Sequence, residues 1–357
     1  IHNVGMEPIL IINSTPTWAQ KFEGYFCGPM GEDFIDEFAA FVNETVKRYS
    51  QPPYNVKYYE IWNEPDESYT YKENNKDSQY GCWGDPYFDD YFGGTYYGQV
   101  LKVVYPALKA AAPDAQLVLG GLLLPSDPEV WTFIRPGDTW PYSDMSKFFE
   151  GVLVECQGYN CFDYVNYHGY TNYITGVHGA LEIEQDQTQS QWAERGGQVE
   201  GKMAYLQELM DKYGVNKPFI LSEAGLIDWN NLVADYDLNF EKSKADYLVW
   251  VYTRNMSLGI DATIWFAFDN YGWLKSGLLG KNNQPLLAYD AYTVLTDLLD
   301  GAAYQRDVNA GEGVLGFEFG NGTRYWVLFS EDGQNKTITK PDKFLAARDH
   351  LTGLEKS

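Results

Sequence analysis

Basic residues are scarce in this chain of 357 residues, which has 26 lysines and arginines against 50 aspartates and glutamates. The resulting formal net charge of −24 repels polyanions such as nucleic acids, anionic membrane surfaces and acidic polysaccharides. No segment reaches the ~18 consecutive apolar residues that a membrane-spanning helix needs. We therefore expect neither a nucleic-acid nor a membrane partner, and a neutral or cationic substrate fits better.

Sequence motifs for metals and nucleotides are also missing. The four histidines form no HxH or HExxH spacing, and no GxGxxG or GxxxxGK[ST] follows a strand. These absences argue against a metal hydrolase and against a doubly wound nucleotide-binding enzyme. We expect no metal and no cofactor.

Cysteines are few, and none lies in a CxxC spacing typical of zinc sites. Cys156 and Cys161 flank a short polar loop that a disulfide could close. That pairing would leave Cys27 with Cys82, although four cysteines permit three connectivities. Two disulfides would indicate an extracellular, secreted protein.

Aromatic side chains, in contrast, make up 17% of the residues, with 29 tyrosines and 11 tryptophans. This exceeds what a core needs, because tyrosine and tryptophan combine an apolar face with a polar tip. Sugars are bound by such faces, although most of these rings must serve ordinary packing.

Short apolar runs alternate with amphipathic stretches along most of the chain, a pattern that predicts a parallel sheet covered by helices, either doubly wound or closed into a barrel. The predicted strands are residues 9–14, 56–62, 115–121, 162–170, 218–225 and 262–268. After residue 301 the pattern changes to short alternating runs, with a hairpin turn predicted at Asn321 and Gly322.

A long insertion, residues 66–95, follows the second predicted strand and is rich in Tyr, Gly, Asp and Asn. Loops of this length in compact domains are usually functional or disordered. Its aromatic residues Trp83, Tyr87, Tyr91 and Phe92 favour an ordered lid or cleft wall.

Two predicted strands carry glutamates near their ends: YYEIWNEPD presents Asn63 and Glu64, and PFILSEAG presents Glu223. Cleavage of a glycosidic bond needs such a pair, one acid for the leaving oxygen and one carboxylate for the anomeric carbon. The two lie about 5 to 5.5 Å apart when the configuration is retained and ~6.5 to 9.5 Å apart when it is inverted.

The ordered motifs IWNEPD, YHGY, SEAG and IWFAF resemble the clan of retaining glycoside hydrolases whose catalytic glutamates lie on strands four and seven of a (β/α)8 barrel. The STPTWA segment resembles glycoside hydrolase family 39, and His168-Gly169-Tyr170 is also similar to family 5. The resemblance covers nearly the whole chain.

The resemblance implies a role for each matching residue. Glu64 resembles the acid/base and Glu223 the nucleophile, with Asn63 as the contact of the sugar 2-hydroxyl. His168 resembles the histidine beside the acid/base, and Tyr170 the residue that hydrogen-bonds the nucleophile.

Three tryptophans complete the predicted site. Trp265 resembles the platform under the sugar that is attacked, and the clan implies a non-proline cis peptide bond between Trp265 and Phe266. Trp18 and Trp273 are candidate substrate contacts, although packing under a loop is an equal alternative for each.

The fold class is thus predicted as α/β, a TIM barrel with a small C-terminal β domain. Residues 1–300 are predicted to supply barrel strands three to eight, and residues 301–357 the β-sandwich-like domain. Residues 1–5 read as the end of a helix, so the first two strand–helix units are expected to be absent from the sequence.

The sequence predicts a retaining glycoside hydrolase acting on β-linked neutral poly- or oligosaccharides of the glucan or xylan type. The main alternative is a non-catalytic glycan-binding protein on a glycosidase-like barrel, and the presence of both Glu64 and Glu223 argues against it. The sequence does not determine the oligomeric state.

Overall fold

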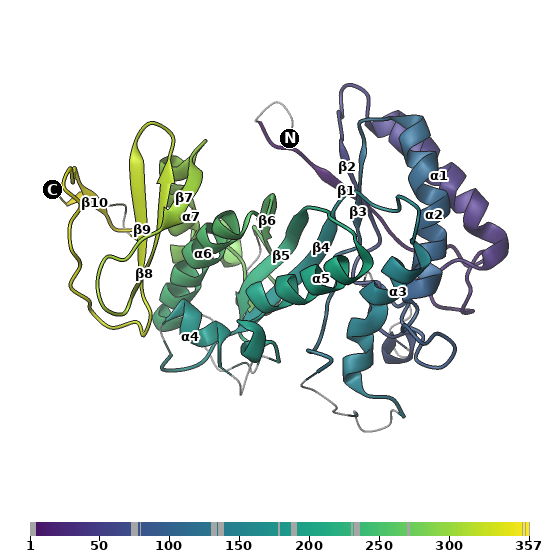
Figure 1. Ribbon diagram of the computed structural model, residues 1–357, viewed down its shortest axis with the longest axis horizontal. Helices are drawn as coiled ribbons and strands as arrows, with labels where there is room; N and C mark the ends of the chain where they lie inside the picture. Colours follow the sequence, from purple (N-terminus) through teal and green to yellow (C-terminus); the bar gives the residue numbers. More distant parts are fainter. Residues whose placement is uncertain are drawn as a thin grey trace. The chain divides into compact units, whose positions relative to one another are not determined.

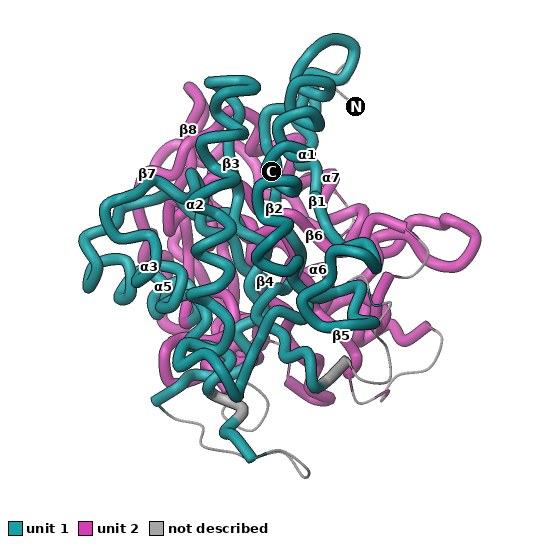
Figure 2. Tube along the Cα trace, turned by 90° about the vertical axis from the view of Figure 1, so that its right-hand side faces the viewer, with its two compact units in different colours: residues 1–168, 202–220 teal, residues 169–201, 221–357 magenta. Residues whose placement is uncertain are grey.

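The computed structural model describes residues 5–72, 78, 80–129, 134, 139–177, 179–186, 191–229, 231, 236–269, 272–351, 353 and 355–356. The expected helix end at residues 1–5 lies outside this range except for Gly5, as does part of the 66–95 insertion. The chain divides into two compact units, coloured separately in Figure 2. Unit 1 comprises residues 1–168 and 202–220, and unit 2 comprises residues 169–201 and 221–357.

Unit 1 is built on a parallel sheet of order β1-β2-β3 (Ile9–Ile12, Tyr58–Ile61 and Gln116–Leu119), shown in Figure 1. Two isolated parallel β-bridges, Val118 to Tyr164 and Leu122 to Tyr167, join the region of β3 to the region of β4 (Val165–Asn172). Parallel pairing requires a crossover after each strand, and helices provide it here.

The crossover helices of unit 1 are α1 (Ile35–Tyr49), α2 (Gly94–Ala111) and α3 (Phe148–Glu155), and α2 packs against both of the others (Figure 1). Helix α1 buries Ala39, Val42 and Val46, which recur at the helical spacing of three to four residues. Acidic residues in its first turn and basic residues in its last complement the helix dipole.

In the next sheet the strand order is β4-β5-β6, with β5 at Phe219–Ile227 and β6 at Ala262–Trp265. Helix α5 (Glu200–Tyr213) leads into β5, and α6 (Leu238–Leu258) leads into β6. The side chain of Asp237 caps the start of α6 by accepting two backbone N–H groups, and Gly259 ends the helix in the left-handed conformation.

Unit 2 ends in an antiparallel sheet of order β7-β8-β9 (Ala303–Asp307, Val314–Gly320 and Arg324–Ser330). Gly320 pairs with Arg324, so the hairpin predicted at Asn321 and Gly322 is confirmed. The remaining elements are α4 (Ala180–Glu184), α7 (Leu287–Leu299), β10 (Ala347–Arg348), β11 (Glu355–Lys356) and 3-10 helices at Glu32–Phe34, Tyr69–Lys72, Tyr142–Lys147, Ala193–Arg195, Trp273–Lys275 and Lys281–Asn283.

The mixed α/β class is confirmed, and each of the six predicted strands is found, with β1 to β6 lying in the expected segments. The strand boundaries differ from the predicted ones at one or both ends by one to three residues, and β5 in particular continues past Glu223 and Gly225 to Ile227. The backbone N–H of Phe266, which follows β6, donates to the Ala224 carbonyl. Pairing with this neighbouring segment therefore extends β5 beyond Glu223. The domain division at residue 300 stays a prediction.

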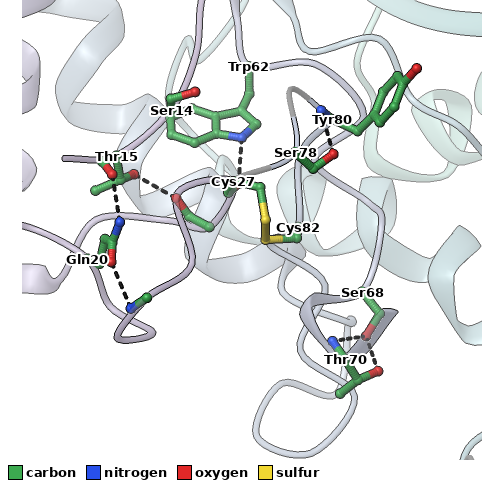
Figure 3. The surroundings of a disulfide bond; sticks show 12 residues. Ser14, Thr15, Gln20, Cys27, Trp62, Ser68, Thr70, Ser78, Tyr80 and Cys82 are labelled. Carbon is green, nitrogen blue, oxygen red and sulfur yellow. Dashed lines mark hydrogen bonds between the residues drawn. A yellow bond between two sulfur atoms is a disulfide. The ribbon is translucent and has the colours of Figure 1, made fainter. Parts of the chain in front are cut away.

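Both expected disulfides are confirmed, Cys27–Cys82 and Cys156–Cys161. Figure 3 shows the first, which ties the 66–95 insertion to the loop after β1. The carbonyl of Cys27 also accepts the indole N–H of Trp62 at 2.9 Å. Closing a loop of 55 residues removes enough chain entropy from the unfolded state to stabilise the fold by about 4 kcal/mol.

Within the described part of the insertion, Trp83 and Phe92 are buried while Tyr87 is exposed. The insertion is therefore anchored by its own aromatic residues as well as by the disulfide. Among the residues that the structure describes, no helix is both long enough and apolar enough to cross a membrane.

Candidate active site

The backbone turns sharply where β2 ends, and this turn carries Glu64. Trp62 and Glu64 have φ values of 74° and 47°, in the left-handed region that residues other than glycine rarely adopt. Such strain persists only where the surroundings enforce it, and it clusters at functional sites. Here Glu64 N–H donates to the Gly121 carbonyl at 3.0 Å, and Gly81 N–H donates to the Asn63 carbonyl at 2.6 Å.

The Glu64 carboxylate is oriented by His168, a residue of β4. Both side chains are buried, and His168 Nδ1 lies 2.9 Å from Glu64 Oε1. The other ring nitrogen lies against Gly121, where an added Cβ would come within 2.0 Å of Nε2. Only glycine at position 121 leaves room for the imidazole, so His168 and Gly121 together fix the direction of the carboxylate.

Asn63 is the second buried polar residue in this turn. Its side-chain oxygen Oδ1 has no hydrogen-bond partner among the described residues. A buried acceptor without a partner costs free energy, and a ligand hydroxyl can supply the missing donor. Asn63, Glu64 and His168 thus form a cluster of candidate site residues within unit 1.

Asp66 also lies in this turn and has a buried carboxyl group. It is not among the site residues predicted from the sequence. It accepts the backbone N–H groups of Leu123 and Leu124 at 2.9 and 2.8 Å and so fastens the loop after β3. Burial, with a smaller contribution from the charge of Glu64, raises the pKa of Asp66 from 3.8 to about 6. The NEPD segment is hydrophilic, so only the fold reveals this burial.

The raised pKa of Asp66 predicts a pH-dependent stability. Between pH 3.8 and about 6 the folded state binds more protons at Asp66 than the unfolded state, so this contribution to stability falls as the pH rises through that window. In urea denaturation, the free energy of unfolding of the wild type relative to Asp66→Asn should fall by about 2 to 3 kcal/mol from about pH 4 to about pH 7. Parallel pH profiles for the two proteins would contradict the raised pKa.

A separate cluster of candidate site residues lies in unit 2, around Glu223 on β5. Tyr170 of β4 donates its hydroxyl to Glu223 Oε2 at 2.5 Å. A hydrogen bond to a carboxylate fixes its orientation. The Tyr170 ring packs edge to face against Phe266 and Trp273, which holds the hydroxyl in place.

Trp265, predicted as a sugar platform, is buried, and its indole N–H donates to the Ser276 carbonyl at 2.7 Å. The prediction of a cis peptide bond between Trp265 and Phe266 is wrong, because the cis bond joins Phe266 to Ala267. Phe266 N–H donates to the Ala224 carbonyl of β5. The cis bond therefore follows this residue and does not precede it.

The other two predicted tryptophans are both accessible to a ligand. Trp18, in unit 1, is 66% exposed and rests edge to face on Phe34. Trp273, in unit 2, is 37% exposed and contacts Tyr170 and Trp229. No sequence motif indicated Trp229. It lies two residues after the end of β5, and this place just past an apolar strand was the available signal.

No family model and no curated protein matches this chain. Solved structures with a similar fold include a family 39 glycoside hydrolase from the gut symbiont Bacteroides cellulosilyticus WH2, at 19% identity and a TM-score of 0.59 over 90% of this chain and 56% of that one. A glucosidase from Croceicoccus marinus matches at 14% identity and a TM-score of 0.54, over 90% of this chain and 59% of that one. A conserved exported protein from Bacteroides fragilis matches at 11% identity and a TM-score of 0.61, over 98% and 72% of the two chains.

The chain therefore spans less than two thirds of the length of the two enzymes. At these identities the similarity concerns the fold. At that level it confirms the resemblance to glycoside hydrolases that the four motifs indicated.

Proposed function

We propose that this chain carries the catalytic machinery of a retaining glycoside hydrolase, with Glu64 as acid/base and Glu223 as nucleophile. The observation that carries the proposal is that each glutamate has its own orienting partner, His168 for Glu64 and Tyr170 for Glu223. A surface carboxylate would have no need of such a partner, whereas a pair that must act on one bond has to be held in position.

The proposal includes the TIM-barrel architecture. Support comes from the parallel run of strands leading into β4 and from the fold similarity to glycoside hydrolases. In a parallel barrel the active site lies at the carboxyl ends of the strands, and Glu64 directly follows one such end. A retaining mechanism requires the two carboxyl groups to lie about 5 to 5.5 Å apart.

In the first step, a Glu223 oxygen attacks the anomeric carbon while Glu64 gives its proton to the leaving glycosidic oxygen. The carbon–oxygen bond to the aglycone breaks as the ester bond to Glu223 forms. Tyr170 holds the nucleophile in position before the attack. In the second step, Glu64 takes a proton from water, the water oxygen attacks the anomeric carbon, and Glu223 leaves as a carboxylate.

Asn63 and Trp265 are proposed to bind the sugar that is attacked. The partnerless Oδ1 of Asn63 would accept a sugar hydroxyl, and the buried ring of Trp265 would support the sugar from below. We propose a β-linked neutral poly- or oligosaccharide of the glucan or xylan type as substrate, since the net charge of −24 disfavours polyanions. Secretion is proposed from the two disulfides and from the similarity to an exported protein.

The test is proton NMR of the anomeric signal while the enzyme hydrolyses a panel of aryl β-glycosides. A double displacement releases the β-anomer first, and mutarotation to the α-anomer follows later. First release of the α-anomer would contradict the assignment of the pair. An absence of turnover on every sugar, together with binding of a glycan, would instead favour the glycan-binding alternative.

A further inference from the structure

Two exposed tryptophans stand together in the part of unit 2 that carries Glu223. Trp229 is 60% exposed and Trp273 is 37% exposed. Their ring centroids lie 5.8 Å apart with an angle of 75° between the planes. The two rings therefore make a corner of nearly perpendicular aromatic faces, which we call the tryptophan corner.

The tryptophan corner is held by a buried ion pair directly behind it. Asp228, which precedes Trp229, is buried and accepts a charged hydrogen bond from Lys275 Nζ at 2.8 Å. Its backbone N–H donates to the Leu274 carbonyl at 3.0 Å. Two bonds thus join Asp228, the residue before Trp229, to Leu274 and Lys275, the two residues after Trp273.

The tryptophan corner is continuous with the nucleophile. Trp273 packs edge to face against Tyr170, with centroids 4.9 Å apart, and the Tyr170 hydroxyl bonds to Glu223 at 2.5 Å. Trp229 is the outermost ring of this series. The series leads from the carboxylate that would attack one sugar to an exposed aromatic face.

We propose that the tryptophan corner binds a second sugar residue of a β-linked neutral chain, next to the sugar attacked by Glu223. This inference rests on the proposed function and names a specificity-determining residue, Trp229, for it. The apolar C–H face of a pyranose stacks on one indole while its edge meets the other, so the angle between the rings fixes the orientation of the sugar. The charges of Asp228 and Lys275 offset one another in this ion pair, as suits a neutral ligand.

Core packing does not account for Trp229. A ring that is 60% exposed gains little from burial, whereas immobilising a large apolar side chain at the surface costs conformational entropy. Exposed aromatic groups held rigidly in this way are typical of binding surfaces.

The test compares Trp229→Ala with the wild type on an aryl β-glycoside of one sugar and on soluble hexasaccharides, cellohexaose and xylohexaose. Loss of one stacking contact is worth roughly a tenfold change in affinity. We expect kcat/KM for the preferred hexasaccharide to fall about tenfold more than kcat/KM for the monosaccharide glycoside, mainly through KM. Trp229→Tyr should recover most of this loss, because it keeps an aromatic face.

The matched control is Tyr159→Ala, which removes an exposed ring from the disulfide loop before β4. It should leave both activities at the wild-type level. Equal losses on short and long substrates in Trp229→Ala, or no loss on either, would overturn the tryptophan corner while leaving the catalytic proposal intact.

Binding separates this proposal from the proposed catalysis. In native gels containing soluble β-glucan or xylan, the wild type should be retarded by one of them, and Trp229→Ala should be retarded less. If the protein hydrolyses no substrate but Trp229→Ala is still retarded less than the wild type, the tryptophan corner is supported and the catalytic assignment is contradicted. Retardation that is unchanged by the substitution, or absent in the wild type, would overturn the tryptophan corner.

Discussion

Glu223→Ala is expected to lower kcat/KM on aryl β-glycosides by at least ~10⁴-fold, the largest effect that we predict for any single substitution. Removing a covalent nucleophile removes the intermediate itself, and losses of this order are typical when one member of a catalytic unit is deleted. The measurement is initial-rate kinetics on the aryl glycoside that gives the highest wild-type activity. Glu194→Ala, which removes an exposed glutamate of the same unit, should retain wild-type activity.

Added azide extends the Glu223→Ala experiment. The substitution leaves a space on the face from which the carboxylate would attack, and azide can react there without an ester intermediate. The product should therefore be the α-glycosyl azide, with inverted configuration. A variant that keeps more than about a tenth of wild-type activity without azide would contradict Glu223 as nucleophile.

Tyr170→Phe isolates the orienting hydrogen bond to Glu223. A hydrogen bond to a charged group contributes about 1.5–3 kcal/mol, so the loss should be roughly tenfold to hundredfold. An effect well below that of Glu223→Ala would place Tyr170 as a positioning residue.

Glu64→Ala is expected to lower kcat/KM by about 10²- to 10⁴-fold, and the loss should depend on the leaving group. An aglycone of low pKa departs without a proton, so dinitrophenyl glycosides should retain most of the first step. Aglycones of high pKa need the acid and should lose the most. The measurement is kcat/KM over a series of aryl β-glycosides, compared with the wild type.

Azide again distinguishes the two carboxylates, because in Glu64→Ala it attacks the glycosyl ester from the face of the missing base. The product should be the β-glycosyl azide, opposite to that from Glu223→Ala. A loss that is the same for every leaving group, or formation of the α-azide, would rule out Glu64 as acid/base.

His168→Asn should shift the pH profile of kcat/KM and give a smaller loss than Glu64→Ala, since His168 acts through Glu64.

The local pattern of side chains was sufficient for most of the secondary structure. The short runs ILII and YYEI form strands, as their β-branched and aromatic residues predict, although only Ile12 of the first run is buried whereas three of the four residues of the second are. The hairpin at Asn321 and Gly322 follows from the left-handed turn that glycine allows. The end of β5 was wrong because a neighbouring strand, which the local sequence does not contain, determines how far the pairing continues.

The sequence by itself determined the α/β class and the six strands, since composition and periodicity act over short distances. The two candidate glutamates came from motifs near the ends of two predicted strands and from the resemblance that these motifs carry. Only the tertiary structure decided which cysteines pair, that Asp66 is buried with a raised pKa, and that Trp229 meets Trp273 beside Tyr170. These features join residues far apart in the chain. Their burial and contacts depend on the path of the chain in space, which no local pattern contains.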